Sequence, residues 1–369
     1  MLRTLPIFAS LIGRFALTNA IPTGDLPLSD AVEAQRIDPR QTAYWKPPMK
    51  SNIQFILTGI PDVDEDFIRP NAGIYEVDMF YTPDTTIKKM NDLGQKVICY
   101  FSAATAENWR DDYSQFQRQD LGKELPDWPG ERYLDIRRDN VFKVIQKRID
   151  LAKQKGCNAI EPDNVDVYSN DNGFTPAIVP DDTIKYLHKV SAYARSLGMS
   201  VGIKNCVEIL GDIFDDVDFA ISEQCVQYLN CTAYANFTTA PAPGKEGKPV
   251  FEVEYVNYTY TGEWSDDGVA LTPTAFRTQN VDFPGLKDEK LRRKLCNLDE
   301  PGVTVDSPYL KINTIIKTLA LDGFIMFCDG SVERTRTKDV GQKKNAGDMV
   351  VRRGWAREKM WRRSMGLPV

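Results

Sequence analysis

Short apolar runs alternate with longer amphipathic segments from Trp45 onward. Runs rich in β-branched and aromatic side chains predict strands, whereas apolar residues that recur every three or four positions predict helices. The predicted strands are Ile53–Leu57, Ile74–Phe80, Lys96–Phe101, Tyr133–Ile136, Ala159–Ile160, Ser200–Ile203, Asp218–Ser222 and Val250–Tyr255. The predicted helices are Thr85–Leu93, Asp139–Gln154, Thr183–Leu197 and Val207–Phe214.

This alternation predicts a parallel α/β fold, and eight such units fit a (β/α)8 TIM-type barrel over residues 45–330. A Rossmann-type sheet is the alternative. Against it, no Gly-x-Gly-x-x-Gly follows the first strand, and no phosphate-binding Gly-x-x-x-x-Gly-Lys-Ser/Thr occurs. Gly323–Cys328 is a ninth candidate strand, so either one of the eight assignments is wrong or the barrel has an extra strand.

The two ends of the chain differ from its centre. Residues 1–20 have the pattern of a secretory signal peptide, because Arg3 precedes the apolar run Leu5–Leu17 and Ala20 is small enough for cleavage. Arg14 interrupts that run, so a frayed N-terminal helix is the alternative. Residues 21–44 are interpreted as a linker or pro-segment, and residues 331–369 as a basic, poorly ordered tail. Asn-x-Ser/Thr sequons agree with a secreted, extracellular glycoprotein, and they lie at Asn230, Asn236 and Asn257.

Charge narrows the range of partners. The formal net charge is −6, and the tail is basic, so the rest of the chain is strongly acidic. An acidic body argues against nucleic acid as a partner and suits a cationic or neutral substrate. After the N-terminal segment no apolar run approaches the ~18 residues of a membrane helix, so no membrane partner is expected. We expect a monomer.

The cysteine and histidine content limits the types of catalytic site that the chain can form. Among seven cysteines, Cys225 and Cys231 are the expected disulfide pair, and Cys99, inside an apolar strand, is expected to be a buried free thiol. The only histidine is His188, on a predicted helix, where a structural or exposed role is usual. Serine and cysteine triads need a histidine base, and zinc hydrolases need two or three histidine ligands. Carboxylates therefore remain as the catalytic groups, and the sequence calls for no metal or organic cofactor.

Nearly every predicted strand ends in a polar or charged residue. These residues are Asp78, Ser102, Asp135, Arg137, Glu161, Asp163, Asn164, Asp166, Lys204, Asn205, Glu223, Gln224, Glu254 and Tyr255. On a barrel they would converge at the C-terminal mouth. Taken alone, each carboxylate could be a salt-bridge partner, and the stretch from Glu161 to Asp166 could be a solvated acidic loop. Together with nearby aromatic residues they indicate a glycosidase cleft, which needs two carboxyl groups.

The sequence resembles glycoside hydrolase family 114, the endo-α-1,4-polygalactosaminidases. The resemblance covers residues 45–255 and, more loosely, 310–328. It rests on ordered blocks at Val97–Ala103, Trp109-Arg110, Leu134–Arg137, Lys155–Cys157, Glu161–Asp166, Asn170-Asp171, Gly202–Asn205, Glu223–Cys225 and Val253–Tyr255. It implies a (β/α)8 barrel that cleaves within α-1,4-linked galactosamine polymers such as polygalactosamine or galactosaminogalactan. Ser222 stands where the family usually has Asn, and Ala103-Ala104 where a Gly is common.

The resemblance also implies a catalytic pair, Asp163 and Glu223. We assign Asp163 as the nucleophile, since its polar motif favours the ionised form, and Glu223 as the general acid/base. The expected substrate-binding residues are Asp78, Tyr100, Asp135, Asn164, Asp166, Tyr168, Lys204, Glu254 and Tyr255. The surplus of carboxylates would attract the ammonium groups of galactosamine. A glycosidase of another α-linked polysaccharide and a non-catalytic amino-sugar-binding barrel are the alternatives.

Overall fold

The computed structural model describes residues 44–64, 66–126, 128–226, 228, 230–239, 243–256, 288–296 and 312–340. The expected signal peptide, most of the linker, the sequon at Asn257 and most of the basic tail lie outside the described residues. In the described part, no helix combines the length and apolarity needed to cross a membrane.

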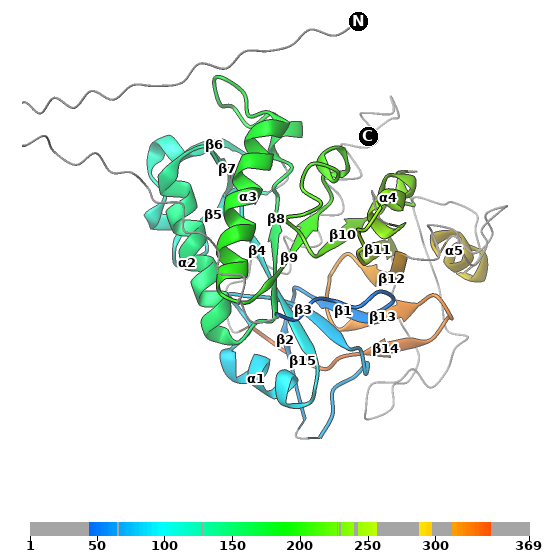
Figure 1. Ribbon diagram of the computed structural model, residues 1–369. Coiled ribbons are helices and arrows are strands. Elements are labelled where there is room, and N and C mark those ends of the chain that lie inside the picture. Colours follow the sequence, from blue (N-terminus) through cyan, green and yellow to red (C-terminus); the bar gives the residue numbers. More distant parts are fainter. Residues whose placement is uncertain are drawn as a thin grey trace, which may run out of the picture. The chain divides into compact units, whose positions relative to one another are not determined.

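One ten-stranded sheet forms the centre of the fold (Figure 1). Eight of its strands are parallel: β1 (Ile53–Ile56), β3 (Ile74–Asp78), β4 (Lys96–Ser102), β8 (Ala159–Asp163), β9 (Ser200–Lys204), β10 (Phe219–Glu223), β11 (Val250–Val256) and β12 (Ile312–Thr318). Two antiparallel strands, β13 (Phe324–Phe327) and β14 (Val332–Arg334), extend it beyond β12. The (β/α)8-type barrel is thus confirmed, and it carries two additional strands where the sequence suggested one.

Helices follow several of these strands, as a βα repeat requires. They are α1 (Asp84–Asp92), α2 (Asp139–Lys155), α3 (Pro180–Ser196), α4 (Ala235–Thr239) and α5 (Asp288–Leu295). Short 3-10 turns are η1 (Tyr113–Gln115), η2 (Arg118–Asp120), η3 (Val167–Ser169), η4 (Val207–Ile209) and η5 (Cys231–Tyr234). The prediction of a helix over Val207–Phe214 is wrong, because only η4 and turns occupy that range.

One predicted barrel strand belongs to a different sheet. The predicted strand Tyr133–Ile136 corresponds to β7 (Glu131–Leu134), which pairs antiparallel with β5 (Thr105–Glu107) and β6 (Leu121–Glu124). The missing barrel strand is β12, which the sequence reasoning did not assign. Apolar alternation identifies a strand but not its partner, so this error could not be avoided from the pattern alone. A further two-stranded pair joins β2 (Ile60–Pro61) to β15 (Thr337–Lys338).

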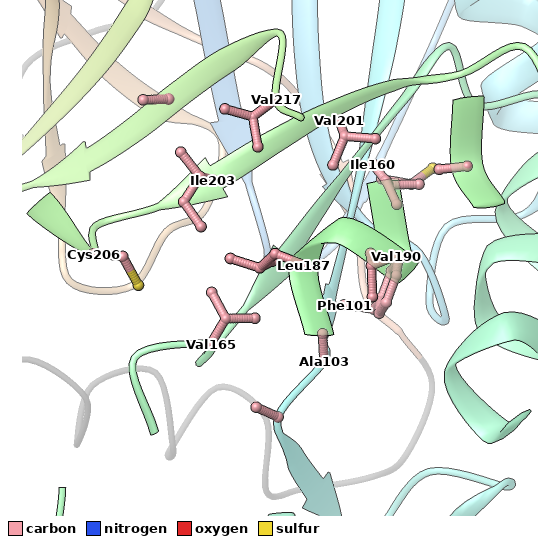
Figure 2. Close-up of a cluster of buried hydrophobic side chains, with 14 of the residues drawn as sticks. Phe101, Ala103, Ile160, Val165, Leu187, Val190, Val201, Ile203, Cys206 and Val217 are labelled. Atoms are coloured by element: carbon pink, nitrogen blue, oxygen red, sulfur yellow. The ribbon is translucent and has the colours of Figure 1, made fainter. Parts of the chain in front are cut away.

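The core has two parts, because alternate side chains of each strand point to opposite faces of the sheet. Alternate side chains of the parallel strands, including Phe55, Ile98, Phe219 and Phe251, form one buried cluster on one face of the sheet. The intervening side chains pack with the helices in a larger cluster. Figure 2 shows part of this larger cluster, where Leu187 and Val190 of α3 lie among side chains from the strands. Because successive side chains point to opposite faces, parity also fixes which polar residues point into the barrel.

Three disulfides join the described cysteines, and Cys206 is buried and free. The predicted pair Cys225–Cys231 is confirmed. The expectation of a free thiol at Cys99 is wrong, because Cys99 bonds Cys157 across 58 residues. Cys157 follows Gly156, whose φ of 90° ends α2 and turns the chain back towards the sheet. The third pair is Cys296–Cys328.

Removal of the Cys99–Cys157 disulfide is expected to destabilise the fold. Replacing both cysteines by alanine should lower the free energy of unfolding by about 3 kcal/mol, because the cross-link limits the freedom of the unfolded chain. Urea unfolding without reductant measures this difference. Equal midpoints for the double variant and the wild type would show that the bond adds nothing to stability.

A buried lysine connects β1 to the β12–β13 hairpin. The Lys317 ammonium donates to Gln54 Oε1 at 2.9 Å, to the Asp322 carbonyl oxygen at 2.7 Å and to the Phe324 carbonyl oxygen. Gln54 in turn donates to the Gly323 carbonyl oxygen at 2.9 Å. Burial lowers the pKa of Lys317 to about 7. This part of the barrel is therefore held by side-chain contacts in addition to the strand ladder.

Lys317 should make the stability rise with pH. In the unfolded chain a lysine titrates near 10.4, so above pH ~7 the unfolded state binds more protons than the folded state, and alkaline pH favours folding. From pH 7 to 9 the free energy of unfolding of the wild type should rise by about 2 kcal/mol relative to Lys317→Met. Urea titrations of both proteins at each pH measure the gap. Parallel profiles would contradict the lowered pKa.

Candidate active site

Lys204 lies at the centre of a cluster of carboxylates at the strand ends. Its Nζ atom is 3.2 Å from Glu161 Oε1, 3.7 Å from Asp163 Oδ1 and 3.4 Å from Glu223 Oε2. We call these four residues the Lys204 cluster. Their side chains are at most 7% exposed. The structure thus brings together both residues of the expected catalytic pair and one expected binding residue, with a cation between them.

The chain turns sharply immediately after each of the three contributing strands. Asn164, Asn205 and Gln224 follow Asp163, Lys204 and Glu223, and each has a positive φ, between 53° and 62°. Left-handed backbone is uncommon for residues other than glycine and concentrates at functional sites. The turn ends each strand at the charged residue. The three charged side chains are therefore held by the rigid strand ends, and the loops begin just beyond them.

Glu161 and Glu76 lie deeper in the barrel than the pair. Glu161 precedes Asp163 by two residues on β8, and Glu76 precedes Asp78 by two on β3, so each faces the same side as its partner. Both are fully buried. Burial raises the pKa of Glu161, while the positive charge of Lys204 opposes this rise. Burial raises the pKa of Glu76 well above its ordinary value, and the negative charge of Glu161 adds to the effect.

Asn164 is held by the small β5–β7–β6 sheet. Its Nδ2 donates to Ser102 Oγ at 2.9 Å, and lies 3.3 Å from both Thr105 Oγ1 and Glu131 Oε1. The Thr105 hydroxyl donates to the same Glu131 oxygen at 2.5 Å. Because Asn164 follows Asp163 directly, this network fixes the backbone at the end of β8. The misassigned strand β7 therefore supplies Glu131 to the surroundings of the cluster.

The two expected binding residues on β11 face opposite sides. The Tyr255 hydroxyl donates to Glu223 Oε1 at 2.5 Å, so Tyr255 contacts the Lys204 cluster. Glu254 is fully buried and accepts from the backbone N–H of Val226 at 2.8 Å, and Glu252 accepts from that of Cys225 at 2.7 Å. Successive residues of a strand point apart. Glu254 therefore holds the disulfide-bridged loop after β10 on the face away from Tyr255.

Asp78 is engaged by an arginine. Arg110 reaches its two oxygens at 3.2 and 2.7 Å, and the backbone N–H groups of Phe80 and Tyr81 donate to Oδ1 at 2.8 and 3.0 Å. Arg110 also pairs with Glu107 at 2.8 Å. Two carboxylates thus share one guanidinium. The contacts of Asp78 connect the loop after β3 to the small β5–β7–β6 sheet. Asp78 therefore has a structural role here, whereas the sequence predicted that it binds substrate.

The remaining expected binding residues lie in different surroundings. Asp135 directly follows β7, outside the barrel sheet, and pairs with Arg137 at 2.7 Å. Tyr100 lies on β4 inside the barrel and is buried. Asp166 precedes η3 in the loop after β8. Within η3, the Tyr168 hydroxyl donates to Glu208 Oε2 at 2.9 Å, and the side chain is half-buried. Asp166 and Tyr168 therefore both lie in the loop that follows Asp163.

One candidate metal-ligand group among the described residues contacts other parts of the protein. Among the described residues, one group brings three possible ligands together, and it consists of Cys225, Glu252 and Glu254. Cys225 is bonded to Cys231 and offers no thiolate, and both glutamates accept backbone N–H groups. The single histidine, His188, lies on α3, is 48% exposed and contacts Asp216 at 2.7 Å. His188 is therefore a surface residue, as the sequence suggested.

The sequence reasoning missed two buried carboxyl groups. Glu76 and Glu131 were not among the expected site residues, yet one lies beside Glu161 and the other holds Asn164. Strand parity could have found Glu76, because it lies two residues before Asp78 on a strand whose C-terminal end had been identified. No comparable signal marks Glu131, whose role depends on how a separate sheet packs.

Comparison with known proteins identifies a family whose members resemble this chain. The model of glycoside hydrolase family GH114 matches residues 34–333, which include the whole Lys204 cluster. The structure of Ega3 from Aspergillus fumigatus in complex with galactosamine is 32% identical in sequence with a TM-score of 0.62, and the match covers 78% of this chain and 98% of Ega3. The glycoside hydrolase domain of PelA from Pseudomonas aeruginosa is 10% identical with a TM-score of 0.48, over 73% and 96% of the two chains. No curated protein sequence matches.

Proposed function

Because this chain belongs to glycoside hydrolase family GH114, we propose that it cleaves α-1,4-linked galactosamine polymers with Asp163 and Glu223 as its carboxylate pair. The observation that supports this most is the position of Lys204, which contacts both carboxylates at the ends of two barrel strands. Glycoside hydrolysis needs two carboxyl groups on either side of the scissile bond. The similarity to Ega3, solved with galactosamine, supports the choice of sugar.

The charges of the site suit a cationic sugar. Glu161, Asp163 and Glu223 surround one ammonium group, so the cluster has a formal surplus of negative charge. An amino sugar that is not acetylated brings an ammonium group of its own. A site with surplus negative charge attracts such a group and pairs with it at close range. Within this proposal, Tyr100, Asn164, Asp166, Tyr168 and Tyr255 contact or orient the sugar.

The geometry limits the mechanism. Since Lys204 Nζ contacts Asp163 Oδ1 and Glu223 Oε2, these two oxygens lie no more than about 7 Å apart. Retaining enzymes place their carboxyl groups about 5–5.5 Å apart and inverting enzymes about 6.5–9.5 Å apart. The limit admits the retaining distance and only the lower end of the inverting range. We therefore propose a retaining reaction in which Asp163 attacks the anomeric carbon and Glu223 protonates the leaving oxygen.

Lys204 and Tyr255 orient Glu223 in this mechanism. Its Oε1 accepts from the Tyr255 hydroxyl, and its Oε2 faces the ammonium group of Lys204. In the second step Glu223 takes a proton from the water that releases the sugar from Asp163, as microscopic reversibility requires. The anomeric configuration of the first product, followed by NMR, tests the assignment. A product of inverted configuration would exclude Asp163 as a nucleophile.

The substrate is tested with a matched panel of polymers. The purified full chain is incubated with deacetylated polygalactosamine, with its N-acetylated form and with amylose, which is also α-1,4-linked but neutral. Mass spectrometry should detect oligosaccharides from the deacetylated polymer and far fewer from amylose. Cleavage of amylose alone would point to another α-linked substrate. Binding of polygalactosamine without any product would support a non-catalytic barrel and contradict the proposal.

A further inference from the structure

Glu76 is a buried carboxyl group that the mechanism above does not use. It lies in the interior of β3 and is fully buried. In the part of the chain that the structure describes, neither of its oxygens receives a hydrogen bond from a backbone N–H group or from a neutral or cationic side chain. A buried polar group without a partner is costly. The charge of Glu76 and the group it contacts therefore need an explanation.

The surrounding charges disfavour an ionised Glu76. Glu161 and Asp163 on β8 and Lys204 on β9 are the charged groups that act on it. If all carboxyl groups of the cluster and Glu76 were ionised, four negative charges would share one ammonium group inside the barrel. An uncompensated buried charge is expensive, and such groups bind a proton instead. Burial and the negative charge of Glu161 raise the pKa of Glu76 accordingly.

The surroundings of Glu161 indicate which of the two carboxyl groups carries a proton. Glu76 and Glu161 are fully buried and face the same side of the sheet, and no hydrogen bond from a described donor reaches any of their four carboxyl oxygens. Two carboxylates only accept, so a hydrogen bond between these groups requires that one of them is protonated. Glu161 lies 3.2 Å from the Lys204 ammonium, which favours its ionised form. Glu76 is then the acid, and its proton is donated to Glu161.

We propose that Glu76 is a positioning residue, a neutral carboxylic acid that donates to Glu161 and thereby fixes the anion that holds Lys204 between Asp163 and Glu223. Its effect on catalysis passes through Glu161 and Lys204. The kinetic part of this inference rests on the proposed function. The position of the proton does not, and it can be tested without a substrate.

The first test compares the stability of the wild type and of Glu76→Gln as pH changes. If Glu76 keeps its proton when folded and loses it when unfolded, the folded state binds one proton more above pH ~5, and the stability of the wild type falls as pH rises. Glutamine binds no proton, so the ratio of the two unfolding constants should change about tenfold per pH unit between pH 5 and 7, in favour of the variant. The exposed Glu124→Gln is the control and should show a constant ratio. A constant ratio for Glu76→Gln would overturn the proposal.

The second test separates positioning from packing. Glu76→Leu keeps the volume but removes the donor, and we expect kcat on polygalactosamine to fall about tenfold while KM changes little. Glutamine still donates through its amide, so Glu76→Gln should restore kcat to within about threefold of the wild type. The corresponding change at the acceptor, Glu161→Gln, should lower kcat more than Glu76→Leu or Glu76→Gln does. Equal losses for glutamine and leucine at position 76 would refute the donor role. A protein inactive on every polymer would leave the stability test intact and would count against the proposed function only.

Discussion

Replacing Asp163 by asparagine is expected to lower kcat on polygalactosamine at least a thousandfold, which corresponds to about 4 kcal/mol of transition-state stabilisation. Asparagine keeps the shape but cannot form the covalent intermediate. Folding should be unaffected, because the Lys204 cluster has more carboxylates than cations, and the loss of one negative charge does not leave Lys204 without a partner. Steady-state kinetics and urea unfolding measure the two effects separately.

A control and a second variant sharpen this prediction. Asp171 is an exposed aspartate in the loop after β8 that pairs with Lys123, so Asp171→Asn should keep nearly full activity. Glu223→Gln should lose activity as strongly as Asp163→Asn. Azide should then distinguish the roles, because a small nucleophile can replace either a missing nucleophile or a missing base. In Asp163→Asn it should give a glycosyl azide of inverted configuration, and in Glu223→Gln one of retained configuration. The reverse pattern would exchange the two roles.

Lys204→Met should have the second largest effect, and it acts on both stability and activity. Removal of one partner from a buried ion pair typically costs 3–5 kcal/mol, and Lys204 is shared by three carboxylates. We expect a loss of about 4 kcal/mol near neutral pH and no measurable hydrolysis. Methionine fills a similar volume, so the loss would report charge and not a cavity.

The pH dependence of Lys204→Met has a definite sign. Without the cation, Glu161 keeps the rise in pKa that burial causes and loses the opposing effect of Lys204. The folded variant then holds protons that the unfolded chain releases, so its stability falls as pH rises and recovers in acid. Urea unfolding of the variant and the wild type from pH 5 to 8 should show a widening gap. A gap that is constant over this range would mean that Lys204 does not compensate these carboxylates.

Much of the barrel could be predicted from the sequence, because its parallel strands are short apolar runs with clear ends. The proposed catalytic pair, Asp163 and Glu223, could be named from the sequence because both residues stand at such ends and match a family motif. Tyr255 and Lys204 were identified for the same reason, and both contact Glu223. A residue at a strand end is thus well constrained by local pattern.

Long-range pairing could not be predicted in the same way. The strand β7 looks like a barrel strand but pairs with β5 and β6, and Asp135 is placed with it. Glu254 was expected at the mouth of the barrel. As the neighbour of Tyr255 on β11, it points to the opposite face of the sheet, where it contacts the loop after β10. The disulfide between Cys99 and Cys157 forms where β4 and β8 are neighbours in the sheet. In each case the missing information is which segments lie side by side.

The left-handed turns after β8, β9 and β10 have a consequence for protein engineering. Because the chain leaves each strand immediately after Asp163, Lys204 or Glu223, the loops start beyond the charged atoms. Loop exchange with relatives that prefer other polymers can therefore begin after Asn164, Asn205 or Gln224 without moving the proposed hydrolytic centre. Retaining these three turn residues as fixed junctions would let a library vary substrate range while the reaction itself stays in place.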